Sequence, residues 1–133
     1  MNGIVDINLN EKKVTLRFSY QGSIIMEKIT AERILNGEHT NDAIIFTDVV
    51  YSGLYGNAMA TRQAIPDYEF AYNLVDEMAN TMDDFAAEKA KIEKAYFESK
   101  FGADFMQRVI DFKKKADEKA ELLSKDLKEN TKS

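Results

Sequence analysis

The sequence predicts an α+β protein in which an N-terminal antiparallel β-hairpin packs against a helical bundle, with long C-terminal amphipathic helices. Apolar residues alternate with polar ones at the start of the chain and recur every three or four residues in most of the rest. The first pattern is typical of half-buried strands and the second of helices. We expect two parts, a hairpin with three helices at residues 1–80 and a charged helical extension at residues 81–133.

Residues 4–19 predict the hairpin. Its apolar residues alternate with polar ones on both sides of a polar turn at Glu11-Lys12, and they are Val5, Ile7, Leu9, Val14, Leu16 and Phe18. Pairing Leu9 with Val14 would place all six on one face. Because an isolated hairpin is marginally stable in water, helices or another chain must cover that face.

Three helices are expected next, at residues 23–35, 43–55 and 67–79. The first ends at Asn36-Gly37, which tolerates a left-handed backbone, and Asn41 or Asp42 can cap the second. Pro66 suits the first turn of the third helix. The expected core of the hairpin and these helices comprises Val5, Ile7, Leu16, Phe18, Ile25, Ile45, Val49, Leu54, Phe70 and Leu74.

Gly53 is unusual because it lies inside the apolar pattern of the second helix. Glycine there costs ~1 kcal/mol relative to alanine. Either a close contact with another backbone or a helix end near Gly56-Asn57 would explain it.

Residues 81–133 predict two further helices. Asp83 or Asp84 can cap the first, whose inner face carries Phe85, the Lys89 stem, Ile92 and Tyr96, and Gly102-Ala103-Asp104 predicts a break. In the second helix, residues 105–127, the apolar positions step by 4, 3, 4, 4, 3 and 4. This 11-residue repeat predicts a straight amphipathic helix, which either packs on the domain or binds another chain. The positions are Phe105, Val109, Phe112, Ala116, Ala120, Leu123 and Leu127.

Composition excludes several classes of function. The 133 residues include no Cys and one His, so that disulfides, Cys chemistry and a multi-His metal site in one chain are excluded. A net charge of −5 disfavours nucleic acid as a partner. The longest apolar run has four residues, and the N-terminus lacks a basic start, so we expect a cytoplasmic protein without a membrane span or signal peptide.

The side chains that could support catalysis lack the arrangement that catalysis needs. Acids are frequent between Asp67 and Glu98, but none forms a Glu-x-x-His pair, so a solvated acidic face is favoured over a di-metal site. His39 has no Cys to activate, and no Gly-x-Ser-x-Gly or phosphate-loop motif occurs. We therefore expect no catalytic residue, metal or cofactor.

Tyrosines are the main candidates for contacts with another protein in the first part. Tyr55, Tyr68 and Tyr72 cannot all be buried if Phe70 and Leu74 define the inward stripe of their region. Exposed tyrosines are enriched at protein interfaces. The candidate protein-binding residues are Tyr55, Tyr68 and Tyr72, together with Phe105, Val109, Phe112, Leu123 and Leu127 of the last helix.

Three short motifs, taken in order, resemble the tail assembly chaperones of long-tailed bacteriophages. The first runs from Phe18 to Ile29, after the strand pair, and the second is Val50-Tyr51-Ser52-Gly53-Leu54. The third runs from Pro66 to Glu77 and ends in Leu-Val-Asp-Glu. The likeness covers roughly residues 10–80.

The resemblance implies a non-catalytic chaperone in the host bacterial cytoplasm. Members of this family bind the long helical tape measure protein until tail tube subunits enclose it. The implied partners are therefore the tape measure protein and the tail tube protein. Open hairpin edges and the apolar terminal helix further predict a homo-oligomer. A small virion structural or head–tail connector protein is the alternative.

Overall fold

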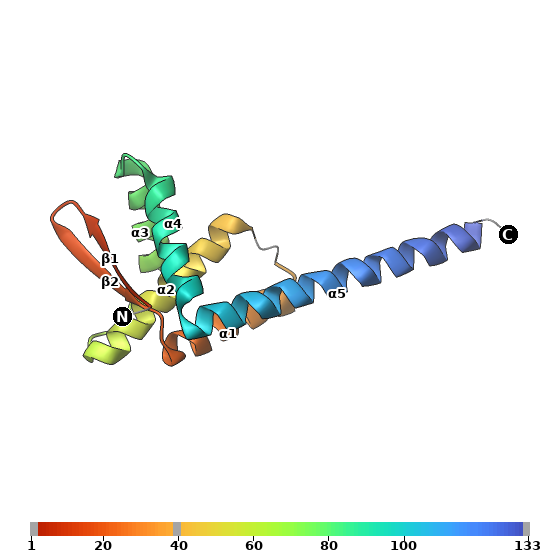
Figure 1. The fold of residues 1–133 in the computed structure, drawn as a ribbon, viewed down its shortest axis with the longest axis horizontal. Helices are drawn as coiled ribbons and strands as arrows, with labels where there is room; N and C mark the ends of the chain where they lie inside the picture. The colour runs from red at the N-terminus through yellow and green to blue at the C-terminus, as the bar shows by residue number, and fades with distance from the viewer. Residues whose placement is uncertain (1–2, 39–40, 132–133) are drawn as a thin grey trace. The chain divides into compact units, whose positions relative to one another are not determined.

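A computed structural model describes residues 3–38 and 41–131, without the side chains of 105, 106, 109, 110, 112, 113, 116 and 126–131. The elements are β1 (Ile4–Leu9), β2 (Lys12–Arg17), α1 (Tyr20–Leu35), α2 (Asp42–Thr61), α3 (Tyr68–Thr81), α4 (Phe85–Glu98) and α5 (Lys100–Thr131) (Figure 1). The two strands pair antiparallel and pack against α2 and α4, which confirms the predicted fold class.

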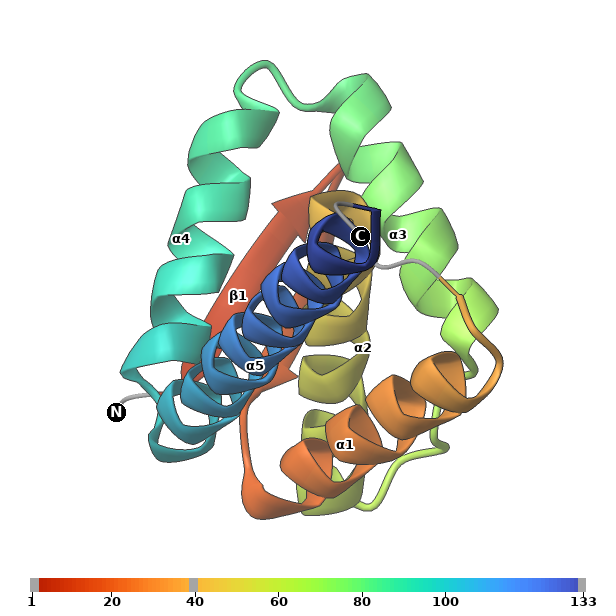
Figure 2. The ribbon, with the colours of Figure 1, turned by 90° about the vertical axis from the view of Figure 1, so that its right-hand side faces the viewer.

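The chain divides into two compact units, Met1–Ala103 and Asp104–Ser133. The first contains both strands, α1 to α4 and the beginning of α5, whereas the second consists mainly of the rest of α5. The expected division at residue 80 stays a prediction, although α4 contributes Ile92 and Tyr96 to the buried core of the first unit. In Figure 2, α4 and α3 stand on either side of α2.

The hairpin has a different register from the one expected. Val5 pairs with Leu16 and Ile7 with Val14, two residues away from the pairing of Leu9 with Val14. The reason is the turn, in which Asn10 and Glu11 both have positive φ, at 45° and 68°. Two such residues form the tight turn that suits the twist of a two-residue hairpin. A shift of two residues leaves the same side chains on the buried face.

Helices α1 and α2 are longer than expected. Helix α1 begins at Tyr20 because Ser19 is its N-cap, with a side-chain oxygen that accepts from the Gly22 N–H. Asn41 caps α2 and accepts from the Ile44 N–H at 2.9 Å. Helix α2 then continues to Thr61, so that the expected end at residue 55 is wrong.

Two glycines inside α2 allow close packing on β2. A Cβ at Gly53 would lie 2.7 Å from the Cβ of Leu16, and a Cβ at Gly56 would overlap the carbonyl oxygen of Arg17. Close approach of the strand therefore explains Gly53, as one of the two interpretations predicted. Gly56 serves the same contact and does not end the helix.

Helix α3 buries Leu74, as expected, but not Phe70. Asp67 is its N-cap, and Pro66 precedes the cap instead of lying in the first turn. The buried side chains are Ala71, Leu74 and Met78, three and four residues apart. Phe70 is 49% exposed, so its place in the predicted core is wrong. It lies about 100° around the helix from Ala71.

The buried core otherwise contains most of the expected residues. Ile25 and Ile45 are only half-buried, because their neighbours Met26 and Phe46 point inward instead, each 2% exposed. The buried apolar side chains are Val5, Ile7, Leu9, Leu16, Phe18, Met26, Phe46, Val49, Val50, Leu54, Ala58, Ala71, Leu74, Met78, Ile92 and Tyr96.

The boundary between α4 and α5 lies at Ser99 and not at the expected break of residues 102–104. Ser99 is extended, with φ −74° and ψ 150°. Gly102 lies inside α5, where a Cβ would overlap the carbonyl of Tyr96. This glycine is therefore required for tight packing of the first turn of α5 on the end of α4, and it does not break the helix.

Candidate protein-binding surface

A cluster of tyrosines joins α2 to α3. The rings of Tyr51 and Tyr68 lie 5.4 Å apart and edge to face, and those of Tyr51 and Tyr55 lie 6.4 Å apart. All three side chains are half-buried. Such edge-to-face pairs stabilise aromatic packing beyond the area they bury. The cluster is therefore first of all part of the packing between the two helices.

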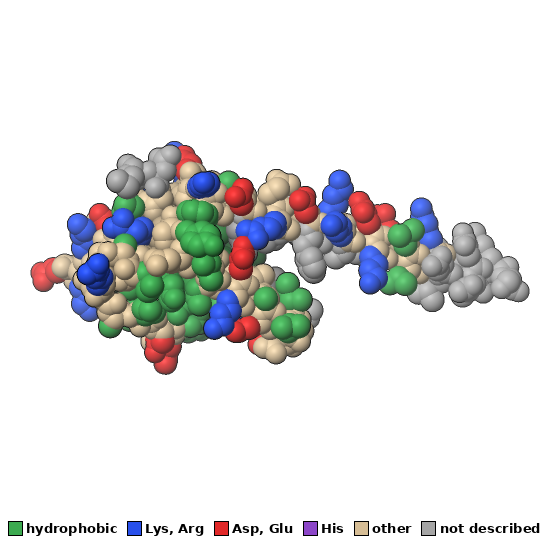
Figure 3. Space-filling model, turned by 90° about the horizontal axis from the view of Figure 1, so that it is seen from below, with side chains coloured by type: hydrophobic (Ala, Val, Ile, Leu, Met, Phe, Trp, Pro, Cys, Tyr) green, Lys and Arg blue, Asp and Glu red, His purple; other side chains and the backbone are tan. Residues whose placement is uncertain are grey.

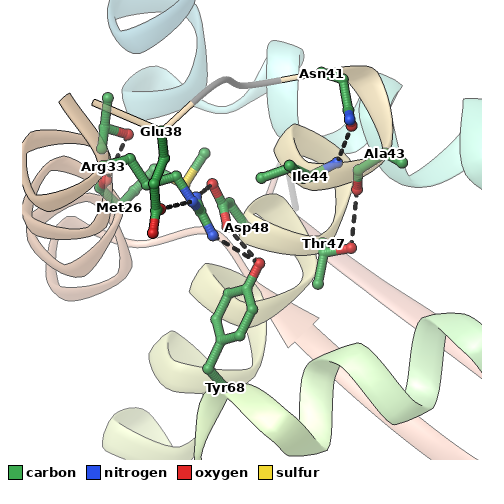
Figure 4. A network of polar contacts seen from close by, with 10 residues as sticks. Met26, Arg33, Glu38, Asn41, Ala43, Ile44, Thr47, Asp48 and Tyr68 are labelled. Carbon is green, nitrogen blue, oxygen red and sulfur yellow. Dashed lines mark hydrogen bonds and ion pairs between the residues drawn. The ribbon is translucent and has the colours of Figure 1, made fainter. Parts of the chain in front are cut away.

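A polar network connects three helices at the same place. Arg33 of α1 forms an ion pair with Asp48 of α2, and Tyr68 of α3 joins both (Figure 4). The Tyr68 hydroxyl donates to Oδ1 of Asp48 at 2.7 Å and accepts from Nη2 of Arg33 at 3.0 Å. The guanidinium carbon also lies 5.5 Å from the Tyr68 ring centroid.

The ion pair of this network is largely buried, which makes it costly to break. The side chain of Asp48 is 4% exposed and that of Arg33 is 14% exposed, whereas Glu38, 3.8 Å from Nε of Arg33, is 58% exposed. Removing one partner of a buried ion pair leaves an uncompensated charge, so such pairs are costly to break. We call Arg33, Asp48 and Tyr68 the three-helix network.

The network shifts the pKa of its own members. Burial, followed by the hydrogen bond to Asp48, raises the pKa of Tyr68 to about 12. Burial also raises the pKa of Asp48, against the opposing effects of its hydrogen bonds from Arg33 and Tyr68. Tyr68 therefore stays protonated at neutral pH and acts as a hydrogen-bond donor.

An open hollow lies between α1 and the tyrosine cluster. Its volume is about 350 Å³, and Lys28, Glu32 and Arg33 of α1 line it opposite Tyr51 and Tyr68. Ile25 and Ile29 also line the α1 side. Because the lining combines charged side chains with apolar and aromatic ones, the hollow suits a side chain with an apolar body and a polar tip.

The solvent side of α1 carries four large apolar side chains among charged ones such as Glu27 and Lys28. Tyr20, Ile24, Ile34 and Leu35 are 64%, 51%, 53% and 85% exposed. At about 100° per residue these four positions share a stripe roughly 100° wide, on the side opposite Met26. We call these four residues the α1 outer face. Figure 3 shows a face of the molecule on which hydrophobic side chains gather among scattered charged ones.

The structure separates the predicted binding residues. Tyr55 and Tyr68 lie in one cluster through Tyr51, whereas Tyr72 is 62% exposed on α3. In α5, Leu123 is 57% exposed and its neighbour Leu122 is 63% exposed. The side chains of Phe105, Val109, Phe112 and Leu127 lie outside those that the structure describes, as does His39. The binding role of all these residues stays a prediction.

Sequence reasoning missed both the three-helix network and the α1 outer face. Asp48 interrupts the apolar face of the second helix, and a lone acid in such a place signals a buried partner. Tyr20, Ile24 and Leu35 lie on the side of α1 away from the buried Met26, and a search for an inner stripe alone does not detect them.

The chain matches no protein-family model, and it is not significantly similar to any curated protein or any solved structure. None of the helices, over the residues that are described, is long and apolar enough to cross a bilayer. Within that same part of the chain, no three His, Cys, Asp or Glu side chains group so that they could hold a metal ion.

Proposed function

We propose that this protein is a non-catalytic tail assembly chaperone of a long-tailed bacteriophage, which binds the tape measure protein and helps to recruit tail tube subunits in the host cytoplasm. The proposal begins from the ordered motifs of residues 10–80. The motif Val50-Tyr51-Ser52-Gly53-Leu54 lies in the middle of α2, and Gly53 packs on β2.

The observation that carries the proposal is the α1 outer face. Four large apolar side chains are at least half exposed on one side of a helix whose other side is in the core. Large apolar side chains exposed on one side of a helix are typical of interaction sites in soluble proteins. An amphipathic helix binds such a surface through apolar residues spaced three and four apart. A long helical client such as a tape measure protein offers many such segments.

Helix α5 adds a second exposed apolar site. Leu122 and Leu123 are adjacent, and both are more than half exposed. Residues 113–133 carry 7 basic and 5 acidic side chains, a net charge of +2. Two separate apolar sites on one small protein favour weak and reversible binding of many copies along a long client. The same exposed sites support a homo-oligomer.

The test is co-expression of the full chain with the neighbouring large tape-measure-like reading frame, followed by affinity recovery. The double substitution Ile24→Ser and Leu35→Ser should reduce the recovered client by about ten-fold, the effect of losing roughly 1.4 kcal/mol of binding free energy. Leu122→Ser together with Leu123→Ser should reduce recovery by a smaller factor. Ile65→Ser is the matched control, because Ile65 is 48% exposed on the segment between α2 and α3.

Two results would contradict the proposal. Equal recovery of the client with the wild type and the α1 double variant would show that the α1 outer face does not bind it. Stable presence of the protein in purified particles would instead favour the alternative, a small virion structural or head–tail connector component. Light scattering over a range of protein concentrations tests the expected self-association separately.

A further inference from the structure

The hairpin leaves one strand edge open to another backbone. The Phe18 N–H donates to the Gly3 carbonyl at 2.7 Å, so residues 3 and 18 form a hydrogen-bonded pair. In an antiparallel ladder such pairs alternate, which gives the bonded pairs Val5–Leu16 and Ile7–Val14. The backbone groups of Lys13, Thr15 and Arg17 therefore point away from β1.

The two edges of the hairpin differ in what covers them. On the β1 edge, Nζ of Lys91 in α4 donates to the Asp6 carbonyl at 3.2 Å. On the β2 edge, Gly56 of α2 lies against the Arg17 carbonyl. Over the residues that the structure describes, the outward backbone groups of Lys13 and Thr15 make no hydrogen bond. The middle of the β2 edge is thus an unpaired template for a further strand.

A hollow of about 430 Å³ lies beside this open edge. Lys13 and Thr15 line one side of it, and Leu54, Ala58, Pro66 and Phe70 line the other. Phe70 is half exposed at the rim. Asn57 and Gln63 also line the hollow. An extended chain on the β2 edge would therefore find backbone partners along one side and a mainly apolar wall along the other.

We propose that the β2 edge binds an extended, acidic segment of a partner protein as a third strand. Its backbone pairs with Lys13 and Thr15, and one of its apolar side chains enters the hollow next to Phe70. This assignment stands independently of the chaperone function, because it rests on the strand edge and not on the α1 outer face.

The charge of β2 indicates an acidic partner and disfavours a second copy of this chain. The strand carries Lys12, Lys13 and Arg17 and no acidic residue. Lys13 lies 3.8 Å from Asp6, but both side chains are well exposed and such a pair is weak. Two β2 strands paired with each other would bring these bases together, and like charges across a strand pair are destabilising. Alternating acidic and apolar residues complement both the bases and the hollow.

The test uses the isotope-labelled full chain and two synthetic hexapeptides, EVEVEV and its charge-reversed counterpart KVKVKV. Near 1 mM, EVEVEV should slow hydrogen exchange of the Lys13 and Thr15 amides by about ten-fold or more. The Asp6 and Asn8 amides, on the other edge, should not change. No slowing at Lys13 and Thr15, or equal binding of KVKVKV, would overturn the proposal.

A substitution at the edge provides a second test. Thr15→Pro removes the outward N–H and leaves the backbone hydrogen bonds between β1 and β2 intact, because Pro is tolerated where the N–H faces solvent. Both Thr15→Pro and Thr15→Val lose the hydrogen bond from the Thr15 hydroxyl to Asp6, so this loss is matched between them. It should weaken EVEVEV binding by about ten-fold, whereas Thr15→Val, which keeps the donor, should not. Equal binding by the Pro and Val variants would refute the strand pairing.

If the Pro variant does not fold, Phe70→Ser tests the same site. It should weaken EVEVEV binding by about ten-fold, while Ile65→Ser, whose side chain does not line the hollow, should leave binding unchanged.

Protection of Lys13 and Thr15 that rises with protein concentration alone, together with a doubled mass, would show that a second copy occupies the edge. That outcome would also overturn the proposal.

Discussion

The two halves of α2 pack against the rest of the first unit in different ways. In the first half, Asp48 takes part in a buried network of charged and polar groups with Arg33 and Tyr68. In the second half, Gly53 and Gly56 bring β2 so close that a Cβ at either position would collide with it. The first contact depends on charge and hydrogen bonding, whereas the second depends on shape alone. The contribution of α2 packing to stability should therefore depend on pH in the first half of the helix and not in the second.

The largest expected effect is in the shape-dependent half. Leu16 is fully buried where β2 meets Gly53, and Leu16→Ala should cost ~2–4 kcal/mol of unfolding free energy. Val49→Ala, in the first half of α2 at a site only 3% exposed, should fall in the same range. Denaturant unfolding measures both, with half-exposed Ile34→Ala as a near-neutral control. A loss below about 0.5 kcal/mol at both buried sites would show that the core is elsewhere.

Gly56→Ala tests the close approach directly. Alanine should favour an exposed helix by ~1 kcal/mol over glycine, yet the added Cβ meets the Arg17 carbonyl. We expect a net loss of about 2–3 kcal/mol in denaturant unfolding, the range for overpacking. Ala60→Gly, at an exposed position of the same helix, should cost only about 1 kcal/mol. A stabilised Gly56→Ala variant would refute the glycine contact.

Asp48→Asn tests the charge-dependent half. The substitution keeps the shape of the side chain but removes the charge that compensates Arg33, and we expect a loss of about 2 kcal/mol. Asp76→Asn, at an exposed position on α3, should change the unfolding free energy by less than about 0.5 kcal/mol. If the two variants are equally stable, the ion pair of the three-helix network contributes nothing measurable.

The substitution with the smallest expected effect is Tyr68→Phe, and the stability that it removes should depend on pH. Tyr68→Phe should cost about 1 kcal/mol at neutral pH, the usual value of a lost hydrogen bond. The folded pKa of Tyr68, about 12, exceeds its ordinary value of 10.0, so its contribution is complete below pH 10 and is lost as the pH rises toward 12. The difference between wild type and Tyr68→Phe should therefore shrink between pH 10 and 12. Tyr72→Phe, at an exposed site, is the control, and a constant difference across this range would contradict the assignment.

Features of the fold that depend on residues close together in the sequence could be predicted from it. The alternation of Val5, Ile7, Leu16 and Phe18 predicts the buried face of the hairpin. Capping residues lie next to the helix that they cap, so the sequence limits each of two caps to a pair of neighbouring residues, of which Asn41 and Asp84 are the caps. The predicted strand register is wrong because Glu11 adopts a positive φ, which is uncommon for a glutamate and is not expected from the sequence.

Features of the fold that depend on contacts between segments far apart in the sequence could not be predicted from it. The helical spacing of Phe70 and Leu74 predicts Phe70 in the core, yet Ala71 points inward, and only the position of α2 decides between them. The sequence around Gly102 predicts a helix break. In the structure, Gly102 instead allows the carbonyl of Tyr96 to lie close to the first turn of α5. The pairing of Arg33 with Asp48 joins two helices across a loop, and no spacing rule specifies it.

The covering of β1 by α4 has a consequence for the order of events during synthesis. The first strand leaves the ribosome early, but Lys91, which bonds to the Asp6 carbonyl, follows 85 residues later. At ordinary rates of translation that interval is on the order of 10 s. For that time the nascent hairpin has an uncovered β1 edge and lacks the buried side chains Ile92 and Tyr96. We therefore expect the final docking of the hairpin to wait for the fourth helix.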